Sequence, residues 1–320
     1  MRCFHVRLAP TESARDKFRV LPSGATRGCV STRVASAADA GTEVAEDPGQ
    51  TSEVCEGDVV VIVGASGGVG RLVMQSLAAT GRYKLRGLVR SLEKAEEALG
   101  ETKGLELAEG NILDEASLGD AMKNAACVVT CTGTTAYPSA RWAGGNTPYA
   151  VDNLAVGNMV RAAADPANHP DGGKLKRFIL LSSIGVERKD GFPFVILNAF
   201  GVLDAKAEGE KTVRRAAKEG GFSYSIVRPG QIAGEPFITF PDGVATPAPE
   251  PEKPDRDASK RMVSLRQGDD VAGNVNPSSV AAVFTQAVSQ PGAADKSFTV
   301  INVKGSHPNQ AEWDELFSNL

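Results

Sequence analysis

The chain is poor in the residues that build metal and disulfide sites. Its 320 residues hold only three histidines and five cysteines. The histidines (His5, His169 and His307) lie far from one another and from any pair of cysteines, so no metal site is expected. The cysteines are odd in number and scattered, so no disulfide framework can be predicted from them.

Two further absences limit the partners. No apolar run approaches the length that crosses a membrane, so no transmembrane segment is expected. The formal net charge is −4, which argues against nucleic acid as a partner. The hydrophobic content of 42% and charged content of 23% are ordinary for a globular protein. The length suits one large domain or two small ones.

The first fifty residues differ from the rest. Residues 1–38 contain seven basic side chains and two acids, and they are rich in Ser, Thr and Ala. A basic, acid-poor, hydroxyl-rich leader before an acidic body is typical of an organelle transit peptide, and a disordered tail is the alternative. We assign residues 1–50 to the transit peptide and a disordered linker, and residues 56–320 to the folded domain.

The strongest motif lies in residues 59–90. An apolar run (59–63) is followed by the glycine cluster GASGGVG (64–70), a stretch with helical apolar spacing, and a second apolar run that ends at Arg90. This order predicts a strand, a phosphate-binding loop, a helix and a strand, the opening βαβ unit of a dinucleotide-binding fold. A substrate for such a protein is a small molecule.

The glycines have separate tasks in this unit. Gly64 permits the tight turn after the strand, Gly67 lets the backbone approach a pyrophosphate, and Gly70 lets helix and strand pack closely. The pyrophosphate would lie on the free N–H groups at the start of the helix. The residues predicted to contact it are Gly64, Ser66, Gly67, Gly68, Val69 and Gly70.

Two arginines indicate which dinucleotide binds. NAD-binding folds place an acid at the tip of the second strand for the ribose hydroxyls, whereas this chain has Arg90 there and Arg71 directly after the last glycine. Two guanidinium groups can hold a 2′-phosphate through bidentate hydrogen bonds, which predicts NADP(H). The alternative is two ordinary surface arginines.

Apolar strand-like runs alternate with helical stretches through the rest of the domain. Strands are expected at 105–112, 126–133, 176–186, 222–230 and 297–303, and helices at 91–99, 113–123, 149–164, 202–219, 277–290 and 310–320. This alternation predicts an α/β protein with a doubly wound parallel sheet. The Pro-rich, charged segment 241–260 is expected to be mobile.

Two loops at the expected carboxyl ends of strands are candidate binding elements. Residues 134–148 contain Tyr137, Arg141 and Trp142, which could close over a substrate; a flexible surface loop is the alternative. Residues 187–201 form an aromatic and aliphatic insert, which could cover a bulky apolar ligand, or contact a protein partner or a membrane surface through 187–200. A loop that packs in the core is the alternative.

Several blocks resemble one family in register. GASGGVG, RFILLSSIGV, FSYSIVRPG and WDELFSNL are similar to the NmrA-like, atypical short-chain dehydrogenase/reductase proteins of chloroplasts. The resemblance covers about residues 57–320. It implies an NADP(H)-binding Rossmann fold, a small C-terminal substrate lobe from about 231–275, and a location in the chloroplast, which agrees with the leader.

The resemblance also implies roles for single residues. Family members usually have Asp where Asn111 stands, but Asn can still accept and donate a hydrogen bond. By the family's pattern, Asn111 and Ile112 flank the adenine, Thr132 and Gly133 the cofactor ribose, Lys206 the nicotinamide ribose, and Pro229, Gly230 and Ile232 the nicotinamide.

One departure bears on catalysis. Typical members use Tyr-x-x-x-Lys, in which the lysine lowers the pKa of a tyrosine that protonates the substrate. Here Lys206 is present, but Val202 stands at the tyrosine position. We therefore expect one of two functions. The first is an NADPH-dependent oxidoreductase that reduces a bulky conjugated acceptor (quinone, flavin or tetrapyrrole-like), with Ser183 (or Ser182) and Lys206 as its catalytic residues. The second is a non-catalytic NADP(H)-sensing or assembly factor for chloroplast membrane complexes.

Overall fold

The computed structural model describes residues 53–99, 105–233, 237–239, 245–247 and 261–320. The expected transit peptide and most of the Pro-rich segment lie outside the described residues. In the described part of the chain, no helix is both long enough and apolar enough to cross a membrane. Those residues also contain no group of three or more His, Cys, Asp or Glu side chains placed to hold a metal ion.

Strand β1 (Val59–Val63) shows why the sheet is covered on both sides. Val60 and Ile62 are buried in one hydrophobic cluster, whereas Val61 and Val63 are buried in another. Successive side chains of a strand point to opposite faces. A strand that is apolar at every position therefore belongs in the middle of a sheet with helices on both faces.

The main sheet has eight strands in the order β10-β12-β6-β5-β4-β1-β2-β3. All neighbouring strands are parallel except β10 and β12. The other strands of this sheet are β2 (Lys84–Val89), β3 (Leu105–Glu109), β4 (Ala125–Thr130), β5 (Arg177–Leu181), β6 (Ser223–Pro229), β10 (Met262–Gln267) and β12 (Lys296–Val303). The chain order reverses between β1 and β4, and ligands of doubly wound sheets bind beyond the carboxyl ends of the strands at such a point. The predicted fold class is confirmed.

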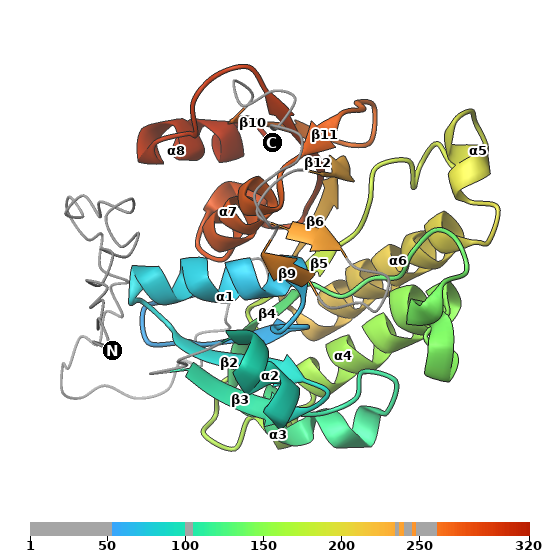
Figure 1. The fold of residues 1–320 in the computed structure, drawn as a ribbon. Helices are drawn as coiled ribbons and strands as arrows, with labels where there is room; N and C mark the ends of the chain where they lie inside the picture. The colour runs from blue at the N-terminus through green and yellow to red at the C-terminus, as the bar shows by residue number, and fades with distance from the viewer. Residues whose placement is uncertain (1–52, 100–104, 234–236, 240–244, 248–260) are drawn as a thin grey trace, which may run out of the picture. The chain divides into compact units, whose positions relative to one another are not determined.

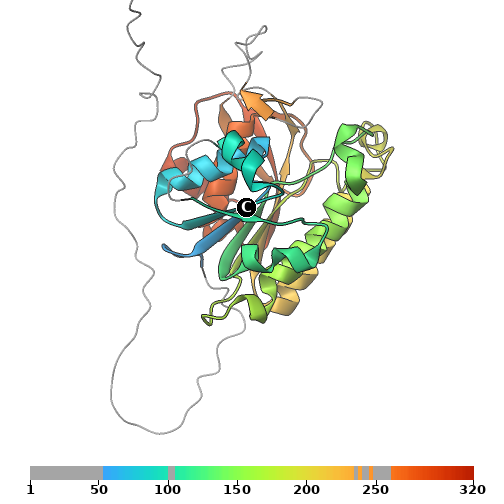
Figure 2. The ribbon, with the colours of Figure 1, turned by 60° about the horizontal axis from the view of Figure 1, so that its bottom comes forward.

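Helices cover the two faces of the sheet (Figures 1 and 2). On one face lie α1 (Gly68–Thr80), α7 (Pro277–Ala287) and α8 (Gln310–Ser318), which contribute Met74, Phe284 and Phe317 to a common core. On the other face lie α3 (Gly119–Met122), α4 (Ala155–Ala164) and α6 (Val202–Gly220), whose core residues include Met159 and Val213. Helix α2 (Leu92–Leu99) follows β2, with the Ser91 hydroxyl accepting from the backbone N–H of Lys94 at 3.4 Å.

The structure differs from the sequence-based expectation in several places. The helix expected at 149–164 begins with a π-helical turn, η3 (Tyr149–Leu154), and the helix expected at 113–123 is divided into a 3₁₀ turn (Glu115–Leu118) and α3. The insert contains a short helix, α5 (Phe194–Leu197). Strand β10 was not expected, because its half-polar sequence suits the edge of a sheet and gives a weak pattern.

The region expected as a substrate lobe contributes to more than one sheet. Its β10 belongs to the main sheet, whereas β7 (Gln231–Ile232) pairs with β11 (Asn274–Val275), and β8 (Phe237–Thr239) pairs with β9 (Ala245–Pro247). The role of residues 231–275 in binding a substrate stays a prediction.

Candidate functional site

The glycine loop joins β1 to α1 with a very close backbone contact. Gly64 has a positive φ of 77°, which favours glycine, and its carbonyl oxygen accepts a hydrogen bond from the N–H of Gly67 at 2.9 Å. A Cβ at Gly70 would lie only 2.1 Å from that same oxygen. Only glycine fits there, as the predicted helix–strand packing requires.

The start of α1 has the chemistry of an anion site. Within the described residues, its first turn contains no acid, and Gly67 at the N-cap offers no side chain to cap it. The N–H groups of the first helical turn lack partners within the helix, and the helix dipole is positive at this end. Gly67 is exposed and Gly68 half-buried, so the loop leaves room for a phosphate. These residues fit the pyrophosphate of a dinucleotide.

The two predicted phosphate-binding arginines lie beside this loop. Arg90 directly follows β2 and is exposed, and no described residue forms a hydrogen bond or ion pair with its guanidinium. Arg71 lies in the first turn of α1 and donates from Nη1 to the carbonyl oxygen of Ala98 on α2 at 3.1 Å. Partial burial lowers the pKa of the Arg71 guanidinium below its ordinary value, but an arginine remains charged at neutral pH. Their contact with a 2′-phosphate stays a prediction.

The residues predicted at the adenine follow the neighbouring strand. Because β2 and β3 pair in register from Leu85 with Leu105 to Val89 with Glu109, Arg90 and Asn111 lie beyond adjacent strand ends. The Asn111 side chain is exposed, and its Oδ1 accepts from the backbone N–H of Leu113 at 3.0 Å. Ile112 is half-buried. The structure thus brings Asn111 and Ile112 to the same edge of the sheet as Arg90.

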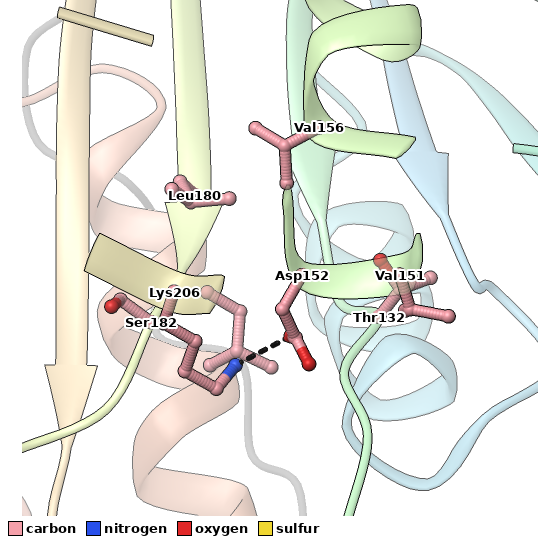
Figure 3. A pocket seen from close by; sticks show the side chains of 8 residues that line it. Thr132, Val151, Asp152, Val156, Leu180, Ser182 and Lys206 are labelled. Carbon is pink, nitrogen blue, oxygen red and sulfur yellow. Dashed lines mark hydrogen bonds and ion pairs between the residues drawn. The ribbon is translucent and has the colours of Figure 1, made fainter. Parts of the chain in front are cut away.

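A small cavity lies beyond the carboxyl ends of β4 and β5 (Figure 3). Its volume is about 10 Å³, about the room that one water molecule needs. Inside it, Nζ of Lys206 on α6 donates to Oδ1 of Asp152 on η3 at 2.8 Å. Thr132 and Ser182 also face the cavity, and Gly133 lies beside the ion pair. The full lining is Thr132, Val151, Asp152, Val156, Leu180, Leu181, Ser182 and Lys206.

Sequence reasoning missed Asp152. Its Oδ2 accepts from the backbone N–H of Thr134 at 3.2 Å and from the Thr134 hydroxyl. The Asp152 side chain therefore links the loop after β4 to η3, on which it lies, and to α6, which carries Lys206. A signal was present: Asp152 lies three and four residues before Ala155 and Val156, which are buried positions of the same helical stripe. An acid in such a stripe indicates a buried, paired carboxylate.

The two serines at the end of β5 have different partners. The Ser182 hydroxyl donates to Oε1 of Glu210 at 2.6 Å, and Glu210 also holds the guanidinium of Arg228, with the closest contact at 2.6 Å. Burial works to raise the pKa of Glu210, but the hydrogen bonds and charge of Arg228 outweigh it and lower that pKa. The Ser183 hydroxyl is half-buried and donates to the carbonyl oxygen of Ile184 at 2.9 Å. The catalytic role predicted for Ser183 stays a prediction.

The predicted nicotinamide side is formed by the end of the next strand. Pro229 closes β6 and is buried with Gly230, whereas Ile232 on β7 is 40% exposed. Because β6 pairs with β5, these residues lie beside the strand end that carries Ser182. Val202 is buried together with Ile184 and other apolar residues, so the tyrosine position of typical relatives belongs to the core here.

The two candidate binding loops pack on each other. The Phe200 ring packs edge-on against Tyr137 and Trp142, with ring centroids 5.9 and 6.2 Å apart. The Tyr137 hydroxyl donates to the carbonyl oxygen of Ile196 at 3.3 Å. Arg141 is half-buried in the same loop. Segments that leave the ends of adjacent strands β4 and β5 thus form one aromatic wall.

The insert has a fixed base and an exposed tip. The buried Asp269 carboxylate accepts from the backbone N–H groups of Gly185 at 2.8 Å and Glu187 at 2.9 Å, and from Arg188 at 3.2 Å. The Arg188 guanidinium lies 4.6 Å from the centre of the Phe194 ring. Beyond this base the apolar side chains Phe192, Val195, Ile196 and Phe200 are exposed by 82%, 48%, 53% and 50%.

Three comparisons relate the chain to known proteins. The sequence profile of a family described as NAD(P)H-binding matches residues 64–291. "Protein TIC 62, chloroplastic" of Arabidopsis thaliana is 33% identical over 55% of this chain, but the match spans only 27% of that protein. An uncharacterized chloroplastic protein of the same plant is 25% identical over 61% of this chain and 66% of its own length. The oxidoreductase YlbE of Lactococcus lactis has the same fold, with a TM-score of 0.58 and 19% identity over 82% of this chain and 96% of that one.

Proposed function

We propose that this chain, which belongs to the NAD(P)H-binding family, is an NADPH-dependent reductase of a bulky conjugated acceptor. It is an NmrA-like, atypical short-chain dehydrogenase/reductase of the chloroplast type, as the resemblance implied. Its chloroplast location is confirmed by the two chloroplastic relatives. The prediction of a nicotinamide dinucleotide cofactor is confirmed by the family.

The arginines support NADP(H) as the preferred member of that cofactor class. The pyrophosphate would lie on the first turn of α1, with the 2′-phosphate between Arg71 and Arg90. Arg71 is anchored by the carbonyl of Ala98, whereas Arg90 has no described partner and can turn toward a phosphate. Lys206 would donate to the nicotinamide ribose, and Pro229 and Gly230 would support the nicotinamide.

The burial of Val202 carries the proposal about the acceptor. A valine with 4% exposure transfers no proton, so the usual reduction of a simple ketone lacks its acid. When bound, NADPH supplies a hydride. Quinones, flavins and tetrapyrrole-like acceptors can take the hydride first and a proton from water afterwards. The aromatic wall of Tyr137, Trp142 and Phe200 suits a planar apolar ring system, which Ser183 would orient.

The experiment is NADPH oxidation by the purified protein with a panel of quinones, flavins and tetrapyrroles. We expect turnover that saturates with at least one acceptor class. Phe200→Ser should raise KM for that acceptor, because it removes the ring that Tyr137 and Trp142 contact. Leu92→Ser, a change at an exposed apolar residue of α2, is the matched control and should leave KM unchanged. A protein that binds NADPH but turns over none of these acceptors would contradict the reductase proposal.

A second function is favoured by the exposed tip of the insert. Phe192 and Ile196 are apolar and mostly exposed on a base that Asp269 holds in place, as expected for a partner surface. In this alternative, the chain is an NADP(H)-sensing or assembly factor for chloroplast membrane complexes. A pull-down from chloroplast membranes should then recover a partner that depends on the NADPH/NADP⁺ ratio. If a Phe192→Ser, Ile196→Ser double variant still recovers every partner, this alternative is refuted.

A further inference from the structure

The carboxylate of Asp152 joins three segments at the carboxyl end of β4. Oδ1 binds the Lys206 ammonium of α6 at 2.8 Å, and Oδ2 binds the backbone N–H of Thr134 at 3.2 Å. Asp152 is 5% exposed and Lys206 is 9% exposed. A buried charge is strongly unfavourable unless it is paired and hydrogen-bonded, so each side chain depends on the other. Figure 3 shows the pair spanning the cavity between the two helices.

The backbone fixes the geometry of this pair. A Cβ at Gly209 would lie 2.3 Å from the carbonyl oxygen of Asp152, so α6 and η3 are in direct backbone contact there. Lys206 precedes Gly209 by three residues and shares its helix face. Asp152 itself lies in a π-helical turn, a rare conformation that occurs frequently at functional sites.

Gly133 leaves the pair accessible from the crevice beyond the strands. A Cβ at this exposed glycine would lie 3.4 Å from Nζ of Lys206 and 3.5 Å from Oδ1 of Asp152. We propose that Asp152 is a positioning residue that holds the Lys206 ammonium in place for the cofactor ribose. This inference rests on the proposed function, in which Lys206 contacts that ribose. An ammonium has three donors, so the bond to Asp152 leaves two for the ribose hydroxyls.

The surroundings make Asp152 the single counter-charge in the cavity. Among the described residues that line it, only Asp152 and Lys206 carry titratable side chains. Glu210, one turn along α6, is already bound by Arg228 and Arg214. Without the carboxylate, no acidic side chain among the described residues of the cavity lining would hold the Lys206 ammonium in place.

The test measures NADPH binding by calorimetry for Asp152→Asn, Lys206→Met and the double variant. Each single change should weaken binding about tenfold, the effect of one charge-assisted hydrogen bond. The double variant should bind no more weakly than Lys206→Met, because Asp152 acts through Lys206. Glu208→Gln, which breaks the exposed ion pair with Lys211 on the same helix, is the matched control and should keep wild-type affinity.

A second variant keeps the inference testable if Asp152→Asn fails to fold. Gly133→Ala leaves the ion pair intact but places a methyl group in contact with both partners, so it should weaken NADPH binding without a change in melting temperature. Any of three results would overturn the inference. They are unchanged or tighter NADPH binding in Asp152→Asn, additive losses of affinity in the double variant, and unchanged NADPH binding in Gly133→Ala. A wild-type chain that binds no NADPH would refute the proposed function as well, which separates the two failures.

Discussion

Arg90 offers the sharpest test of cofactor choice. The residue directly follows β2, is exposed, and has no hydrogen-bond or ion-pair partner among the described residues. Its replacement by alanine therefore removes no hydrogen bond or ion pair within the described part of the chain. Arg71 keeps its anchor on the carbonyl of Ala98, so one guanidinium of the proposed pair remains. The change in affinity should then report the interaction of Arg90 with the ligand alone.

The expected magnitude follows from the kind of contact that Arg90→Ala removes. A hydrogen bond between charged groups contributes about 1.5–3 kcal/mol, and about 1.4 kcal/mol corresponds to a tenfold change in affinity. NADPH affinity should therefore fall by roughly 10- to 100-fold. NADH lacks the 2′-phosphate, so its affinity should change by less than about twofold. The loss for NADPH should shrink at high salt, because an exposed phosphate contact is screened.

The assay is calorimetric titration of both cofactors into wild-type and variant protein. Arg82→Ala is the matched control, since Arg82 is an exposed arginine just before the amino end of the same strand, β2. It should leave both affinities unchanged. Arg90→Asp should discriminate more strongly against NADPH, because it adds a repulsive carboxylate. Equal losses of NADPH and NADH affinity in Arg90→Ala would refute the assignment of the 2′-phosphate to this residue.

Substitutions at Gly67, Glu210 and Val202 test other parts of the structure. Gly67→Val should abolish calorimetric binding of either cofactor, because a side chain there blocks the approach of the backbone to the pyrophosphate. The circular dichroism spectrum should persist, because the N-cap φ of −76° suits valine. Retained affinity would refute the assignment of this loop to the pyrophosphate. Glu210→Ala should lower the free energy of unfolding by about 3–5 kcal/mol in urea titrations, because Arg228 is fully buried. The pKa of Glu210 is lowered in the folded state. Its contribution to stability is therefore present above its unfolded pKa of about 4.3 and is lost as the pH falls through the folded pKa. Glu210→Gln should make the free energy of unfolding depend less on pH in this acid range. Val202→Tyr should reduce stability by about 1–3 kcal/mol in the same titrations without enabling ketone reduction, because its position lies in a packed cluster.

The fold could be predicted because its signals are local and repeated. Fully apolar runs such as 59–63 identify buried parallel strands, and Gly70 marks the close packing that the structure has. The glycine loop also lies between β1 and α1, and Arg90 directly follows β2, as the sequence pattern predicted. These features depend on one segment and its immediate neighbours, which a sequence pattern records directly.

The remaining features depend on contacts between distant segments. Asp152 and Lys206 are 54 positions apart, and nothing in either segment alone names the other as its partner. The contact between Phe200 and Tyr137 likewise joins loops that leave different strands. Strand β10 gains its partner from β12 at the edge of the sheet, where half-polar residues give little periodicity. Tertiary pairing of this kind has no local signature.

Lys206 is informative because the tyrosine that usually precedes it by four residues is absent. In typical relatives, the lysine both lowers the pKa of the tyrosine and binds the cofactor ribose, but Val202 removes the first task. A buried ion pair stabilises a fold weakly, and well-packed apolar residues in its place are often equally stable. Stability alone therefore gives little reason for Lys206 and Asp152 at the floor of the crevice. The proposed contact with the cofactor ribose does give one, because it would need a charged donor held at a fixed point beside Gly133.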